Sequence, residues 1–177
     1  MEPFAAARVV ACYLALPDEV QTTALIAACR QTGKRVCVPA YDARAGRYRF
    51  AWLTENDILI RGRLGISEPV MPEWVEAPED NVHLVLVPGL QFDRERRRLG
   101  HGGGFFDRLL EGLAAYKIGL AVEAQLARRV PVSERDVAMD LVVTEKSFYP
   151  APARRPRRSA RLTGQRRPKG GPRGRNG

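Results

Sequence analysis

The sequence predicts an α/β domain of three layers, in which a mostly parallel central sheet carries helices on both faces. Short apolar segments typical of buried strands alternate with segments of helical periodicity, and this alternation favours a parallel sheet. The chain of 177 residues is long enough to form one domain with a hydrophobic core. We assign that domain to residues 1–149 and consider residues 150–177 separately.

The first third of the chain predicts a strand, a helix and two further strands. Residues 8–16 are rich in Val, Ala, Tyr and Leu and indicate a mostly buried strand. Asp18 is a candidate helix N-cap, apolar residues follow at helical spacing, and Gly33 is suited to end the helix. Residues 34–39 and 47–53 predict two strands, the second half-solvated because its polar and apolar residues alternate.

The remaining elements alternate in the same way. Residues 69–80, with three prolines among acidic residues, indicate a surface excursion. Residues 82–87 form the most hydrophobic predicted strand. Residues 105–115 have helical spacing of apolar side chains, and residues 117–122 and 141–144 indicate two more buried strands.

The formal charge of +9 is concentrated at the C-terminus. Residues 150–177 contain nine arginines, one lysine and no acidic residue, whereas residues 1–149 carry a formal charge of −1. The tail has a single large aliphatic residue, too little apolar surface to offset the entropy lost on ordering. We expect a disordered tail, and two roles remain open for it: solubility with nonspecific polyanion contact, or attachment to RNA or the ribosome.

Composition also indicates where the protein works. No apolar run approaches the roughly 20 residues that a membrane span needs, and the first residues lack the pattern of a secretion signal. Cys12, Cys29 and Cys37 have no C-x-x-C spacing, and with only two histidines in the chain they make no zinc site. We expect three buried, reduced thiols in a cytoplasmic protein.

The segment that follows residues 82–87 and runs into 105–115 contains the candidate functional residues. Its sequence is PGLQFDRERRRLGHGGGFFDRLL. Loops at this position are where α/β sheets bind ligands. Successive glycines let the backbone approach a ligand, so that N–H groups can converge on phosphate oxygens at a helix N-terminus. The loop predicts a phosphate cradle, with a simple tight turn as the alternative. The glycines concerned are Gly100, Gly102, Gly103 and Gly104.

Charged residues on both sides of these glycines strengthen the prediction. Arg96, Arg97 and Arg98 precede them and can bind phosphate, and Asp107 follows as a candidate magnesium ligand or as an ordinary acid of a first helical turn. The spacing excludes both a GxxxxGK[ST] loop and a dinucleotide-binding GxGxxG. An esterase oxyanion loop is excluded because no G-x-S-x-G nucleophile follows.

This segment resembles the signature of the 5-formyltetrahydrofolate cyclo-ligase family, also called methenyltetrahydrofolate synthetases, which is approximately PGxxFDxxGxRLGxGxGYYDxxL. The resemblance extends over about residues 8–146, with further landmarks at 18–22, 33–39, 66–69 and 125–136. The signature positions that match are Pro88, Gly89, Phe92, Asp93, Arg98, Leu99, Gly100, Gly102, Gly104, Asp107 and Leu110.

The resemblance implies an ATP-dependent ring closure that needs magnesium. Members of the family convert 5-formyltetrahydrofolate to 5,10-methenyltetrahydrofolate with release of ADP and phosphate. The formyl oxygen attacks the γ-phosphate of ATP, and N10 then displaces phosphate from the activated carbon. Such a reaction depends on positioning and charge neutralisation more than on a protein nucleophile.

The resemblance also implies roles for individual residues. Arg98 and His101 are the implied catalytic residues, and Asp107 and Asp136 the implied magnesium ligands. Glu19 is implied to bind the reduced pterin, with an acid of a first helical turn as its alternative, and a plain surface histidine is the alternative for His101. The implied ATP contacts are Arg98, Leu99, Gly100, His101, Gly102, Gly103, Gly104, Phe105 and Phe106. The other implied folate contacts are His101, Gly102, Gly103, Gly104 and Phe105.

The chain departs from the family pattern at its N-terminus, at the usual tyrosine pair, and at His101, which replaces the common Arg or Tyr. Members usually begin with a basic helix bearing K-x-x-x-R, whereas only seven residues, none of them Lys, precede the first predicted strand here. This implies a start codon set too far downstream, a loss of catalysis, or compensation by the basic run at Arg96. The usual tyrosine pair is Phe105 and Phe106, which removes two hydroxyls. The alternative function is a catalytically silent folate or nucleotide binder whose tail contacts RNA.

Overall fold

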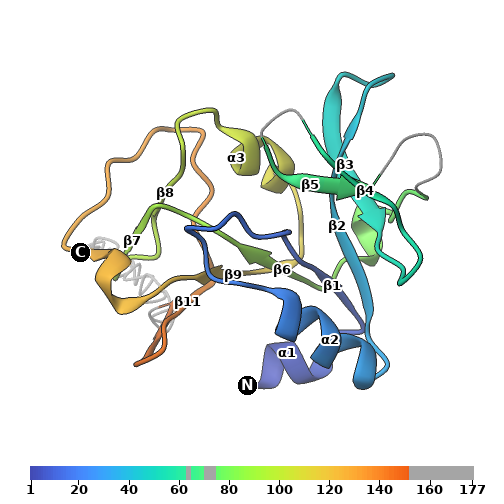
Figure 1. The fold of residues 1–177 in the computed structure, drawn as a ribbon. Coiled ribbons are helices and arrows are strands. Elements are labelled where there is room, and N and C mark those ends of the chain that lie inside the picture. Colours follow the sequence, from blue (N-terminus) through green and yellow to red (C-terminus); the bar gives the residue numbers. More distant parts are fainter. Residues whose placement is uncertain (63–64, 70–74, 152–177) are drawn as a thin grey trace, which may run out of the picture.

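A computed structural model describes residues 1–62, 65–69 and 75–151. Its centre is a sheet of seven strands in the order β12-β11-β9-β6-β1-β2-β3 (Figure 1). The five inner strands are mutually parallel, and the edge strands β12 and β3 run antiparallel to their neighbours. In chain order these strands are β1 (Val9–Ala11), β2 (Arg35–Asp42), β3 (Arg47–Trp52), β6 (Leu84–Val87), β9 (Tyr116–Leu120), β11 (Leu141–Val143) and β12 (Phe148–Pro150).

The helices lie on opposite sides of this sheet, α1 and α2 below it and α3 above it in the view of Figure 1. The predicted α/β class with a mostly parallel sheet is confirmed. Two small sheets flank the central one, β10-β7-β8 and β4-β5. The remaining elements are α1 (Glu2–Ala6), α2 (Thr23–Gln31), β4 (Leu59–Arg61), β5 (Ser67–Pro69), η1 (Glu79–Asn81), β7 (Gln91–Asp93), β8 (Arg98–Leu99), α3 (Phe105–Leu110), η2 (Glu123–Gln125) and β10 (Leu126–Ala127).

The core is built around β6, the strand predicted to be the most hydrophobic. All four of its residues are buried, because its neighbours β1 and β9 flank it and side chains cover both of its faces. The thiols of Cys12, Cys29 and Cys37 are buried and unpaired, as the sequence predicts. No helix in the described ranges is both long enough and apolar enough to cross a membrane.

The region between β1 and α2 differs from the prediction. The strand ends at Ala11 rather than Leu16, and the helix starts at Thr23 rather than after Asp18. The cause is tertiary: the Tyr13 hydroxyl donates to the carbonyl of Val20 (2.7 Å), and the Thr22 hydroxyl donates to the carbonyl of Tyr13 (2.6 Å). These bonds close residues 13–22 into a loop.

Glycines end two helices, one as predicted and one earlier than predicted. Gly33 has φ +73° after α2, and the Lys34 N–H donates back to the carbonyl of Cys29 (2.9 Å), which confirms the predicted stop. Gly112 has φ +72°. It follows α3, which ends at Leu110 rather than at residue 115.

Three further differences concern the edges of the domain. A short helix, α1, precedes the first strand where no element is predicted. The expected excursion at 69–80 partly joins the sheet, since Ala77 donates to the carbonyl of Phe50 (2.8 Å) and Glu76 bridges to Ala51. Strand β12 includes Pro150, one residue past the predicted domain end. Residues 152–177, and with them the predicted disordered tail, lie outside the described residues.

Candidate active site

The loop that follows β6 begins with a hairpin, β7–β8, which is held by a buried carboxylate. Asp93 is fully buried and accepts hydrogen bonds from the N–H of Val130 (2.9 Å) and the N–H of Arg97 (3.0 Å). It also forms an ion pair with Arg97 Nε (2.7 Å). Burial raises the pKa of Asp93, but these bonds outweigh that effect and hold its pKa below the usual value. Asp93 therefore fixes the hairpin that leads into the glycines.

The three arginines of the loop have different surroundings. Arg97 pairs with Asp93 and Glu95, and Arg96 Nε donates to the carbonyl of Met139 (3.0 Å). Compensation by the basic run at Arg96 stays a prediction, and Arg98 is the member of that run that lines the cavity described next.

A cavity of about 290 Å³ lies against the glycine-rich loop. Its wall brings together segments that are far apart in the sequence, from the loops after β1 and β6 and from the start of α3. The predicted site residues that line it are Glu19, Arg98, Gly100, His101, Gly103, Gly104, Phe105 and Phe106. Leu99 and Gly102, predicted to contact ATP, do not line it.

The glycines form an open turn that leads into α3. Gly102 and Gly104 have φ of +87° and +60°, values that side chains rarely allow. A methyl group added at Gly102 or Gly103 would meet no atom of the described residues within 4 Å. The positive φ of Gly102 explains why that residue is glycine. At Gly103 neither packing nor a positive φ requires glycine.

Arg98 is buried on the cavity wall, with only 8% of its surface exposed. Its Nη2 lies 2.8 Å from Asp107 Oδ2, and its guanidinium carbon lies 5.7 Å from the centre of the Phe106 ring. The pairing with Asp107 fixes the guanidinium and leaves the buried Nε without a hydrogen-bond partner among the described residues.

Both predicted metal ligands accept hydrogen bonds from the protein. Asp107 Oδ1 accepts the N–H of Val137 (3.3 Å), which places it beside the backbone that follows Asp136. Asp136 accepts the N–H and the hydroxyl of Ser133 (2.7 and 2.9 Å). Within the described ranges, no three His, Cys, Asp or Glu side chains cluster as metal ligands would.

Glu19 lies in the turn before α2, four residues ahead of its start, so it is not an acid of the first helical turn. Its Oε2 accepts the N–H of Leu16 (2.9 Å). Burial raises the pKa of Glu19, while the Leu16 bond and the nearby His101 act in the opposite direction. The carboxylate is half-buried on the same cavity wall as His101.

Other residues at or beside the cavity lie outside the set that sequence reasoning predicted. Tyr48 of β3 does not line this cavity but packs edge-on against Phe105, which does, with ring centres 4.3 Å apart. Phe105 packs in the same way against Phe106 (4.8 Å). Leu16, Ile66, Pro88 and Gly89 also line the cavity. Ile66 and Pro88 belong to segments included in the family resemblance, but the sequence did not predict that they line the cavity.

Comparison with known proteins gives a consistent result. The model of the 5-formyltetrahydrofolate cyclo-ligase family matches residues 1–145. The 5-formyltetrahydrofolate cyclo-ligase of Escherichia coli (strain K12) is 34% identical over 151 residues, covering 83% of each chain. That of Mus musculus is 28% identical, covering 78% of this chain and 73% of its own. The Aquifex aeolicus 5,10-methenyltetrahydrofolate synthetase structure superposes with a TM-score of 0.70 at 30% identity, covering 90% of this chain and 79% of its own.

Proposed function

The chain belongs to the 5-formyltetrahydrofolate cyclo-ligase family, and we propose that it carries out the family reaction in the cavity at the glycine-rich loop. It is an ATP-dependent ligase that closes 5-formyltetrahydrofolate to 5,10-methenyltetrahydrofolate and releases ADP and phosphate. One observation supports this location above all. Glu19 lines a single cavity with Arg98 and His101, which are distant from it in the sequence and lie beside the exposed glycines.

Arg98 and the loop backbone bind the phosphates of ATP in this proposal. Arg98, which lines the cavity, donates to a phosphate oxygen while its Nη2 stays paired with Asp107. The turn at residues 100–104, where an added methyl group at Gly102 or Gly103 would meet open space, supplies N–H groups to the phosphates in this proposal. His101, exposed next to them, contacts both substrates. Together these groups neutralise the charge that develops as the γ-phosphate is transferred.

Magnesium fits the residues available. A carboxylate offers about four acceptor positions, so Asp107 and Asp136 keep free lone pairs despite their present hydrogen bonds. Mg²⁺ in phosphate-transfer sites is usually held by one or two carboxylates together with substrate phosphates, which is compatible with a pair of aspartates. When bound, the ion would neutralise phosphate charge. We propose that Asp107 and Asp136 hold it.

Glu19 orients the folate. Its carboxylate accepts hydrogen bonds from the donor groups of the pterin ring, and its fixed position relative to Leu16 defines where that ring lies. The formyl oxygen then attacks the γ-phosphate, ADP leaves, N10 adds to the activated formyl carbon, and phosphate departs as the new ring closes. The protein contributes orientation and charge, with no covalent intermediate on a side chain.

Turnover tests the proposal directly. Purified protein with 5-formyltetrahydrofolate, ATP and Mg²⁺ should develop the absorbance of the methenyl product and release ADP in equal amount. Folate binding without turnover would instead support the silent binder. The cytoplasmic location and an RNA contact by the tail stay predictions, and the tail residues from 152 onward lie outside the described structure.

A further inference from the structure

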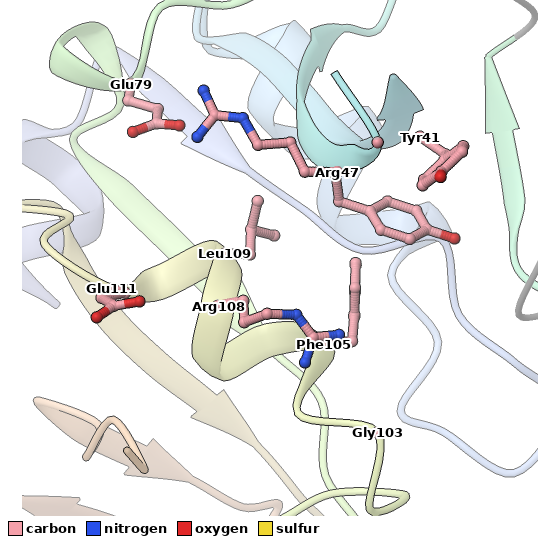
Figure 2. A pocket seen from close by; sticks show the side chains of 10 residues that line it. Tyr41, Arg47, Glu79, Gly103, Phe105, Arg108, Leu109 and Glu111 are labelled. Atoms are coloured by element: carbon pink, nitrogen blue, oxygen red, sulfur yellow. The ribbon is translucent and has the colours of Figure 1, made fainter. Parts of the chain in front are cut away.

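A second, larger pocket of about 680 Å³ adjoins the candidate active site. Figure 2 shows it between the hairpin of β2 and β3 on one side and α3 on the other. Gly103 and Phe105 line both this pocket and the 290 Å³ cavity. The two spaces therefore meet at the glycine-rich loop.

The substrate is longer than the smaller cavity can enclose. 5-Formyltetrahydrofolate consists of a formylated pterin, a p-aminobenzoyl ring, and a glutamate with an α- and a γ-carboxylate. Ligands of drug-like size usually occupy pockets of about 300 to 1,000 Å³. A cavity of about 290 Å³ with Glu19 on its wall suits the pterin, so the rest of the molecule must leave past residues that line the cavity.

The near end of the larger pocket is aromatic. Phe105 packs against Tyr48, and Tyr48 packs against Tyr41 with ring centres 5.2 Å apart. Leu109, which is buried, adds an apolar wall from α3. Ring edges and faces of this kind favour contact with another aromatic ring. This end of the pocket matches the p-aminobenzoyl group in chemistry and adjoins the pterin cavity.

Two arginines lie further along the pocket, and both are exposed. Figure 2 shows Arg108 extending toward Phe105, and Arg47 lying further from Gly103 and pointing toward Glu79. No ion pair joins either arginine to another residue of the described ranges. Guanidinium groups bind carboxylates through paired hydrogen bonds. Both are therefore available to an anionic ligand.

The pocket also contains two acidic side chains, and their position limits how far such a ligand extends. Glu79 and Glu111 lie at the end away from Gly103 (Figure 2). Their charge would repel a carboxylate that reached that end. An anionic tail entering from Gly103 would therefore stop between Arg108 and Arg47.

We propose that this pocket binds the p-aminobenzoyl-glutamate part of the folate, with Tyr48 and Phe105 against the ring and with Arg108 and Arg47 on the carboxylates. The proposal rests on the proposed function, because it takes its ligand from that reaction. It adds two specificity-determining residues, Arg47 outside the family signature and Arg108 at a variable position within it. It also assigns the β2–β3 hairpin a role in substrate binding.

Steady-state kinetics with two folates test the assignment. We would compare 5-formyltetrahydrofolate with 5-formyltetrahydropteroate, which lacks the glutamate, in Arg108→Met, Arg47→Met and the wild type. Each variant should raise the KM for the full folate about fivefold, the effect of losing one exposed ion pair. The KM for the pteroate and the KM for ATP should stay at wild-type values. Arg44→Met, an exposed arginine of the same hairpin that does not line the pocket, should change none of them.

Several results would overturn the assignment. An increase in the KM for ATP would indicate that the pocket binds the nucleotide, and equal increases for both folates would indicate a general effect on the site. Unchanged constants would show that the tail binds elsewhere. A wild-type protein without turnover would contradict the proposed function alone. Dissociation constants of the same two folates, measured by calorimetry on the same variants, would then decide the role of the pocket.

Discussion

The loop after β6 has two parts that differ in how the protein holds them. Its base, the β7–β8 hairpin, is fixed by the fully buried Asp93 and by the pairing of Arg98 with Asp107. Its tip, residues 100–104, includes exposed glycines whose added methyl groups would meet nothing in the protein. The protein stabilises the base with its own groups and leaves the tip open. This difference indicates that the base serves the fold and the tip serves a ligand.

The largest effect on activity should come from Arg98, which lies in the base and also lines the cavity. Arg98→Met removes the buried cation from the cavity, and kcat should fall about 100- to 1,000-fold, as for loss of one fixed donor to transition-state charge. Arg94→Met, at an exposed arginine of the same loop that does not line the cavity, is the matched control and should stay within about threefold of wild type. Equal losses in the two variants would remove the distinction between base and tip.

The sequence predicts the fold and the loop well because both depend on local signals. β6 is an uninterrupted apolar run, and Gly33 ends α2 where its φ requires glycine. The loop between β1 and α2 was missed because the bonds of Tyr13 and Thr22 that form it are tertiary. Tyr48 was missed as a neighbour of the site for the same reason, since only the folded β3 brings it to Phe105.

The free energy of unfolding should depend on the interactions that hold the β7–β8 hairpin, the base of the loop. Asp93→Ala leaves the buried N–H of Val130 without its acceptor and Arg97 without its buried partner, so the free energy of unfolding should fall by about 3 kcal/mol. Asp57→Ala, which removes a partly exposed carboxylate that accepts bonds from the N–H and the hydroxyl of Thr54, should cost about 1 kcal/mol or less. Urea unfolding followed by circular dichroism measures both. A cost for Asp93→Ala no larger than the control would mean that the base is not held as described.

Glu19 should affect the binding of folate without affecting the binding of ATP. Glu19→Gln keeps the size of the side chain but loses the charge that favours pterin donors, so the KM for folate should rise about tenfold while the KM for ATP stays constant. Initial rates at varied concentrations of each substrate measure the two constants. A rise in the KM for ATP alone would place the nucleotide, not the pterin, at Glu19.

Lowering the pH should gradually weaken the interactions that hold the β7–β8 hairpin. The pKa of Asp93 is lower in the folded protein than in the unfolded chain, so its stabilisation is complete above the unfolded pKa of about 4 and is lost as the pH falls through the folded value. The free energy of unfolding should therefore decrease below about pH 4 in the wild type. In Asp93→Asn this decrease should be smaller. If the free energy of unfolding depended on pH in the same way in both proteins, Asp93 would not contribute to the loss of stability in acid.

Gly103→Ala tests most directly whether the tip exists for a ligand. Gly103 has no positive φ and its added methyl group meets open space, so the free energy of unfolding should stay within about 0.5 kcal/mol of wild type. Because the methyl group would lie where we place the substrates, kcat/KM for the cyclisation should nevertheless fall about tenfold. An active protein whose kcat/KM is unchanged by this substitution would contradict the central claim that the glycine-rich loop binds the reacting substrates.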